Sequence, residues 1–174
     1  MSSTIAPDQT PNGVFYNQSQ VSIASITDGT SQTAMFSEHL RGGRVGVNTS
    51  GTNVIFIIPN QSTLMGTFQA CQSVNPQTGL LMCLDMGECW AMGEDCCTQY
   101  NHVSTPNTLF CGGSPFPGGM ENMSMDSPPS SNHTGGVNVL FCDGSVLFIT
   151  NSISLQTWQA MGTRNGGDIL GSDY

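Results

Sequence analysis

The chain has 174 residues, with twelve acidic side chains, three basic ones and a net charge of −9. This length suits one domain of ordinary size that buries a hydrophobic core without extra cross-links. The acidic balance argues against nucleic acid as a partner, because phosphate binding needs a basic surface, and it is typical of exported proteins.

The first third of the chain contains short apolar or alternating runs that are bounded by turn residues. Asp28-Gly29 marks one turn, where the carboxylate is expected to accept backbone N–H groups from Thr30 or Ser31. The runs themselves predict strands at 14–16, 21–26, 34–38 and 53–58.

Residues 61–129 hold six of the seven cysteines and many Gly, Pro and Asn residues. This composition predicts a long loop region that disulfides order, which favours an oxidising compartment. Cys142, in a predicted strand, is the expected free thiol. The disulfide candidates are Cys71, Cys83, Cys89, Cys96, Cys97 and Cys111.

The same loop region contains two groups of candidate metal ligands. Clustered carboxylates are ligands that Ca²⁺ prefers, with a solvated acidic loop as the alternative. Clustered thioethers select Cu(I), with a small methionine core as the alternative. Zinc is disfavoured, because no Cys-x2-Cys spacing is present. The acidic group is Asp85, Glu88, Glu94 and Asp95, and the thioether group is Met120, Met123 and Met125.

A β-hairpin is the strongest structural prediction. Residues 137–142 and 145–150 are β-rich, and Asp143-Gly144 between them is typical of a type I′ turn. Both faces of this hairpin are largely apolar, so we expect it to lie centrally in a sheet. The predicted cross-strand pairs are Phe141–Val146, Leu140–Leu147 and Val139–Phe148.

The segments on either side of the hairpin are also predictable. Residues 125–132 form an extended connector into it, because two prolines oppose helix there. After it, Ser154 is the expected N-cap of a short helix at 155–161, which the glycines that follow bring to an end.

Histidine and acidic residues near the hairpin favour structural roles. The imidazole of His133 is expected to hold the hairpin by bonding a carboxylate or carbonyl, whereas metal binding lacks further ligands at a matching spacing. Asp143 is expected to cap the N–H of Ser145. Glu38 and His39 read as a solvated cluster at a strand end, and no catalytic residue is assigned.

Three phrases of the sequence resemble a bacterial prepilin-like family named for a His-x9-Asp-Gly motif. They are Asp-Gly-Thr-Ser-Gln-Thr with the later Glu38, His133 through Asp143-Gly144, and Thr-Arg-Asn-Gly-Gly near the C-terminus. The residues that carry the resemblance, and that we expect to be structural, are Asp28, Gly29, His133, Asn138, Asp143, Gly144 and Arg164.

The resemblance implies an exported, pseudopilin-like subunit of a cell-surface or secretion filament, with no catalytic residues to carry over. Its expected partners are copies of itself or other pilin-like subunits. Full-length members begin with a leader and an apolar helix, and residues 1–4 show no signal-peptide features. We therefore expect the chain to begin after a cleavage or truncation point, with membrane contact only through that missing helix.

The resulting prediction is one α+β domain over residues 1–174, with a cysteine-rich insertion at about 61–129. Antiparallel sheet should predominate, together with a short C-terminal helix and a long disulfide-rich loop region. The expected function is structural and non-enzymatic, and the alternative is an extracellular module that binds Ca²⁺ or copper.

Overall fold

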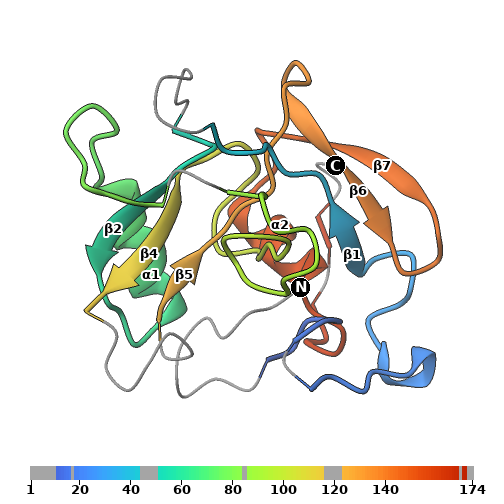
Figure 1. Cartoon of the computed structure of the whole chain (residues 1–174). Coiled ribbons are helices and arrows are strands. Elements are labelled where there is room, and N and C mark those ends of the chain that lie inside the picture. Colours follow the sequence, from blue (N-terminus) through green and yellow to red (C-terminus); the bar gives the residue numbers. More distant parts are fainter. Residues whose placement is uncertain are drawn as a thin grey trace.

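Two small sheets lie on opposite sides of the molecule, and long loops fill the space between them (Figure 1). The computed structural model describes residues 11–16, 18–43, 51–83, 86–115, 123–168 and 170–171. The predicted α+β class is confirmed. Within the described residues, no helix has the length and apolar character needed to cross a membrane. The elements are η1 (Ile23–Ser25), β1 (Ala34–Ser37), β2 (Ile55–Pro59), α1 (Leu64–Gln72), β3 (Leu81–Cys83), β4 (Phe110–Ser114), β5 (Met125–Asp126), β6 (Gly136–Phe141), β7 (Val146–Thr150) and α2 (Leu155–Met161).

The first sheet is antiparallel, with the strand order β1-β6-β7. Alternate residues of β6 point into a core that includes Trp158 and Met161 of α2. The side chain of Ser154 accepts a hydrogen bond from the backbone N–H of Thr157, as the predicted N-cap requires. The helix prediction is therefore confirmed, but only β6 is central, because β7 is an edge strand.

The hairpin between β6 and β7 exists, but its predicted turn and register are wrong. Gly144 has a φ of +90°, whereas Asp143 is not among the residues with positive φ, so the turn is not type I′. Leu140 pairs with Val146 and Val139 with Leu147, one residue away from the predicted register. The backbone N–H groups of Cys142 and Asp143 donate to carbonyls of residues 33 and 30. The turn therefore has three residues, 142–144, and these bonds to a distant segment stabilise it. The sequence pattern does not indicate them.

The second sheet is mixed, with the strand order β3-β2-β4-β5 and with β2 parallel to β4. The predicted strand at 53–58 corresponds to β2. Helix α1 packs on one face of the sheet, where the Cys71–Cys111 disulfide joins α1 to β4. The described residues of 61–129 are mostly loop, as predicted, although the segment also supplies α1, β3, β4 and β5, which the sequence pattern did not indicate. Its strands are short: β3 and β4 each pair with β2, and β5 pairs with β4.

Two predicted N-terminal strands are absent. Residues 14–16 have no regular structure, and the 21–26 segment forms only the 3-10 turn η1. Ile23 is 77 % exposed, so the alternating pattern has no buried face to cover. The Ser25 hydroxyl also bonds the Ser22 carbonyl, a local bond that competes with strand pairing. The strand expected at 34–38 corresponds to β1.

A buried connector links the two sheets. Residues 123–130 are all buried, and they continue from β5 toward β6. The side chain of Asn101 donates to the Met125 carbonyl and accepts the N–H of Ser127, while Ser130 donates its N–H to the Glu38 carbonyl. The connector thus bonds the central loops and the end of β1, and it positions His133 near Glu38.

Candidate functional site

Glu38 joins two of the three motif phrases. One carboxylate oxygen, Oε1, accepts hydrogen bonds from the backbone N–H of Asn138 at 2.6 Å and from its Nδ2 at 3.0 Å. The other oxygen lies 3.3 Å from Nε2 of His133. The expectation that His133 bonds a carboxylate beside the hairpin is confirmed, and Glu38 is the carboxylate.

This His133–Glu38 pair lies at the surface. The side chains of His133 and Glu38 are 55 % and 32 % exposed, and the imidazole stands edge-on to Phe148 with ring centroids 6.3 Å apart. A histidine and a carboxylate within reach of each other are chemically able to transfer protons. Here, however, the carboxylate mainly serves the backbone of β6, which is what a structural brace requires.

The two partners of this pair should differ in their contribution to stability. Replacing Glu38 with alanine leaves the N–H of Asn138 without its acceptor, so we expect a loss of about 1–3 kcal/mol in the free energy of unfolding. Replacing His133 with alanine should cost about 0–1 kcal/mol, because it removes a surface pair with Glu38 and an edge contact with the exposed Phe148. Urea denaturation of both variants measures the difference, and equal losses would contradict this assignment.

The carboxylate of Asp28 bonds the C-terminal loop at residues 163–167 and not the turn that follows Asp28. Its carboxylate accepts the hydroxyl of Thr163 at 2.9 Å, the N–H of Gly166 at 2.7 Å and the N–H of Gly167 at 2.9 Å. The prediction that Asp28 bonds Thr30 or Ser31 is not what the structure shows. Three donors from one distant loop satisfy the carboxylate better than its local turn, while Gly29 supplies the positive φ of that turn at +102°.

Arg164 fixes the first described residues of the chain. Its Nη1 donates to the carbonyls of Pro11 at 3.0 Å and Gly13 at 2.8 Å. The guanidinium carbon also lies 5.5 Å from the centre of the Tyr16 ring, within the range of a cation–π contact. Arg164 is therefore structural in this fold, as the resemblance implies.

Asp143 caps the hairpin turn as predicted. Its Oδ1 accepts the backbone N–H of Ser145 at 2.9 Å and the Ser145 hydroxyl at 2.7 Å. These bonds to the charged form lower the pKa of Asp143, although the group is fully exposed. Gly144 follows with positive φ, and both residues thus serve the turn.

The predicted calcium ligands are dispersed where the structure describes them. Asp85 lies outside the described residues. Glu88 forms an ion pair with Arg41 at 3.6 Å, and Asp95 accepts the hydroxyl of Ser127 at 3.3 Å. Among the acids described, Glu88, Glu94 and Asp95 do not come together as one three-ligand group.

The predicted copper ligands divide in a similar way. Met120 lies outside the described residues. Met123 and Met125 are 8 % and 2 % exposed. Both pack with Met86 and Phe110 in the hydrophobic core on the face of the second sheet opposite α1. Their packing matches the alternative interpretation, in which methionines form a small core.

The other two histidines are largely buried packing residues. His102 stacks on Trp158 with ring centroids 3.9 Å apart, and its Nδ1 lies 2.6 Å from the Trp158 carbonyl. Burial lowers the pKa of His102 to about 3. His39 stands edge-on to Phe110, and burial lowers its pKa to about 4. Both rings are therefore neutral near pH 7.

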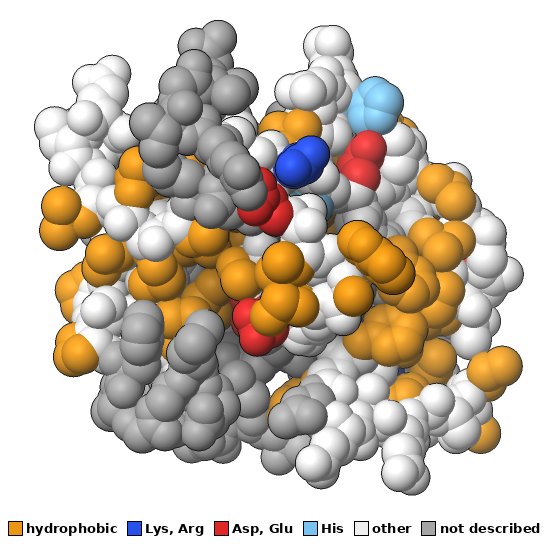
Figure 2. Space-filling model, in the orientation of Figure 1, with side chains coloured by type: hydrophobic (Ala, Val, Ile, Leu, Met, Phe, Trp, Pro, Cys, Tyr) orange, Lys and Arg blue, Asp and Glu red, His pale blue; other side chains and the backbone are white. Residues whose placement is uncertain are grey.

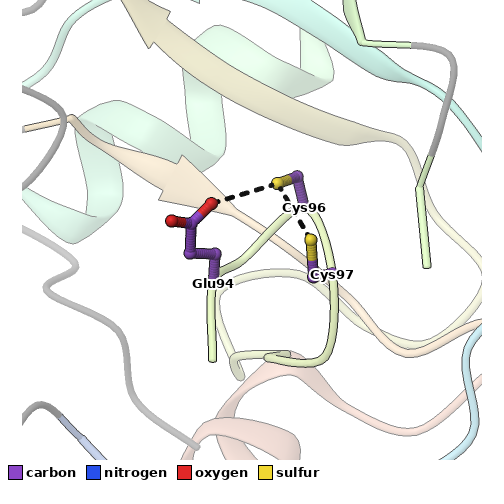
Figure 3. A group of neighbouring side chains, drawn as sticks. All are labelled: Glu94, Cys96 and Cys97. Carbon is purple, nitrogen blue, oxygen red and sulfur yellow. Dashed lines mark hydrogen bonds between the residues drawn. The ribbon is translucent and has the colours of Figure 1, made fainter. Parts of the chain in front are cut away.

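Glu94, Cys96 and Cys97 form the one group of three potential metal ligands that we find in the described part of the chain. Figure 3 shows the two thiols and the carboxylate on one tight turn. Sγ of Cys96 lies 3.5 Å from Sγ of Cys97 and 3.7 Å from Oε2 of Glu94. The absence of Cys-x2-Cys spacing does not exclude this group, because the two cysteines are adjacent and Glu94 precedes Cys96 by two residues.

The electrostatics of this group reflect crowded thiols. Burial raises the pKa of Cys96 to about 12, with further increases from the neighbouring Cys97, Cys83 and Glu94. Burial likewise raises the pKa of Cys97. Both thiols are thus protonated near pH 7 unless a positive charge lies beside them.

Comparison with known proteins gives one family match. The model of a family described as "Protein of unknown function (DUF1559)" matches residues 2–156, which include the Asp28 turn, Glu38 and the whole hairpin. The search of curated proteins and the search of solved structures returned no match.

Proposed function

This chain belongs to the DUF1559 family of proteins of unknown function, and we propose that it is an exported structural protein, a pseudopilin-like subunit of a cell-surface or secretion filament. In this role it has no enzymatic activity, and its partners are copies of itself or related subunits. The observation that carries the proposal is an exposed apolar face on the first sheet, because subunits need such surfaces for assembly.

The exposed face is formed by residues that pair across the sheet. Phe36 of β1, Leu140 of β6 and Val146 of β7 lie in one row through direct strand pairing, and Phe148 pairs with Asn138 beside it. Phe36, Val146 and Phe148 are 41 %, 58 % and 45 % exposed. Figure 2 shows hydrophobic side chains gathered on the side of the molecule where these strands lie. The opposite face of β6 is buried in the core.

The edge strand β7 adds a second means of contact. Among the described strands, β7 pairs only with β6, so its other edge carries backbone groups that a further strand can use. An apolar face next to an open edge suits a second copy of the chain, since the same sheet offers both parts of the contact.

Structural use of the motif residues supports a non-enzymatic role. Glu38 and Asp28 each accept backbone N–H groups from segments more than 90 residues away along the chain. His133 and Arg164 likewise bond distant parts of the fold. Glu38 and His133 join the end of β1 to the hairpin, whereas Asp28 and Arg164 join the N-terminal segment to the C-terminal loop.

Self-association is testable with a charged substitution on the apolar face. The wild-type chain should associate as its concentration rises in sedimentation velocity, and filaments should be visible by electron microscopy. Val146→Lys should weaken association at least tenfold, about 1.4 kcal/mol, because it places a charge within the contact. Its folding should be unchanged, since Val146 is 58 % exposed.

Leu80→Lys is the matched control, because Leu80 is 72 % exposed on the other sheet's side of the fold and should leave association unchanged. A wild-type chain that stays monomeric at high concentration would refute the assembly proposal. Export has its own test: protease added to intact cells that produce the protein should digest it, whereas protection would contradict a surface location.

A further inference from the structure

The turn that carries Glu94, Cys96 and Cys97 has the dimensions of a metal-binding turn. In a tetrahedral site, zinc-ligand bonds of about 2.3 Å to sulfur and 2.0 Å to oxygen place two sulfurs about 3.8 Å apart and a sulfur and an oxygen about 3.5 Å apart. The observed separations are 3.5 Å for Cys96 to Cys97 and 3.7 Å for Cys96 to Glu94. Cys96 therefore lies at ligand spacing from both neighbours, and all three donor atoms lie within 4.8 Å of one another.

Backbone hydrogen bonds hold this turn in place. The carbonyl of Glu94 accepts the N–H groups of Cys97, Thr98 and Gln99, at 2.9, 3.0 and 3.1 Å. The Gln99 side chain donates to the Gly93 carbonyl at 2.6 Å, which ties the two ends of the turn together. The Cys96 side chain is partly buried against the methionine-lined core on the second sheet. This packing restricts the position of its sulfur.

We propose that Glu94, Cys96 and Cys97 bind one Zn²⁺ ion through a carboxylate oxygen and two thiolate sulfurs, with water in the fourth position. Binding releases two thiol protons to solvent, because thiolates and not thiols ligate the metal. Two sulfurs exclude Ca²⁺, which takes oxygen ligands, and the carboxylate favours a borderline metal such as Zn²⁺ over Cu(I). This proposal is independent of the filament function.

The test is a zinc titration of the full chain, reduced and then freed of reductant without oxygen, in competition with a chromophoric chelator. We expect one Zn²⁺ per chain. Addition of Co²⁺ should produce the charge-transfer absorption of thiolate ligation. Zinc should also raise the melting temperature, because it binds only the folded turn.

Variants connect the binding to the named ligands. Cys96→Ser, Cys97→Ser and Glu94→Gln should each weaken zinc binding at least tenfold, with unchanged far-ultraviolet circular dichroism. Cys142→Ser is the control, because Cys142 is a free thiol at the hairpin turn of the other sheet. No bound zinc, or equal affinity in Cys96→Ser and wild type, would overturn the proposal. A disulfide at Cys96 in the protein isolated from its source, found by mass spectrometry, would overturn it as well.

Discussion

Replacing Trp158 with alanine is expected to lower the free energy of unfolding by about 3–5 kcal/mol, the typical cost of removing a buried aromatic side chain. Trp158 has no exposed surface and is the largest side chain of the core between α2 and the first sheet. Its ring also stacks on His102. The substitution leaves a cavity and frees the histidine, so helix α2 should lose its main attachment to β6.

Trp90 provides a matched control for this prediction. The chain has two tryptophans, and Trp90 is 86 % exposed. Trp90→Ala should change stability by no more than about 0.5 kcal/mol, as surface substitutions usually do. Urea unfolding followed by far-ultraviolet circular dichroism compares the two variants without relying on tryptophan fluorescence. Similar losses in both would show that α2 does not pack as described.

Acidification from pH 7 to pH 4 is expected to destabilise the protein by about 3 kcal/mol, the net result of opposing buried groups. His102 and His39 have native pKa values of about 3 and about 4, below the ordinary 6.5. As the pH falls, these histidines are protonated in the unfolded chain before they are protonated in the native state. The stability that they give the native state is therefore fully present above pH 6.5. It falls as the pH drops toward 4, by about 6 kcal/mol for the pair.

Asp126 acts in the opposite direction. Burial raises its native pKa to about 7, and its Oδ2 accepts the hydroxyl of Ser104. Its other carboxylate oxygen is buried and has no hydrogen-bond partner among the described residues. The native state therefore binds the proton more tightly than the unfolded chain does. This group's contribution is complete below pH 3.8 and is lost as the pH rises to about 7, which offsets about half of the histidine effect.

Asp126→Asn separates these contributions. The variant should be more stable than wild type at pH 7, by up to about 4 kcal/mol, because it no longer buries a charge. It should then lose about twice as much stability as wild type between pH 7 and pH 4. Urea denaturation at pH 7, 5.5 and 4 measures both curves. Parallel curves for the two proteins would show that Asp126 titrates normally.

Local signals in the sequence were sufficient for several elements. Ser154 begins a helix that the following glycines end, and Asp143 caps the turn before Ser145, because each of these bonds joins residues at most three positions apart. The apolar run of β2 was recognisable from its composition. The chemistry at these positions is complete within a few residues.

Features that depend on distant partners were not predictable in the same way. The sequence predicts Glu38 to be a solvated residue at a strand end. No neighbouring residue in the sequence indicates that its carboxylate accepts the backbone N–H of Asn138. The sequence pattern does not indicate the Cys96–Cys97 turn as a site, since its three potential ligands share no established metal-binding spacing. The spacing of the methionines is compatible with a copper-binding loop. Only the packing of Met86 and Phe110 around Met125 shows that the latter is a core residue.

The sequence by itself determined the fold class, the hairpin and the C-terminal helix, because periodicity, caps and turn residues are local properties of the chain. Only the tertiary structure decided the hairpin register, the strands β3, β4 and β5 that residues 61–129 add to the second sheet, and the partners of Asp28, Glu38 and His133. The physical reason is that strand pairing and buried hydrogen bonds join residues far apart in the sequence. The partner of each strand or donor is therefore set by the tertiary packing. The final geometry of the thiol turn follows from the same packing, and with it the metal that this turn is proposed to bind.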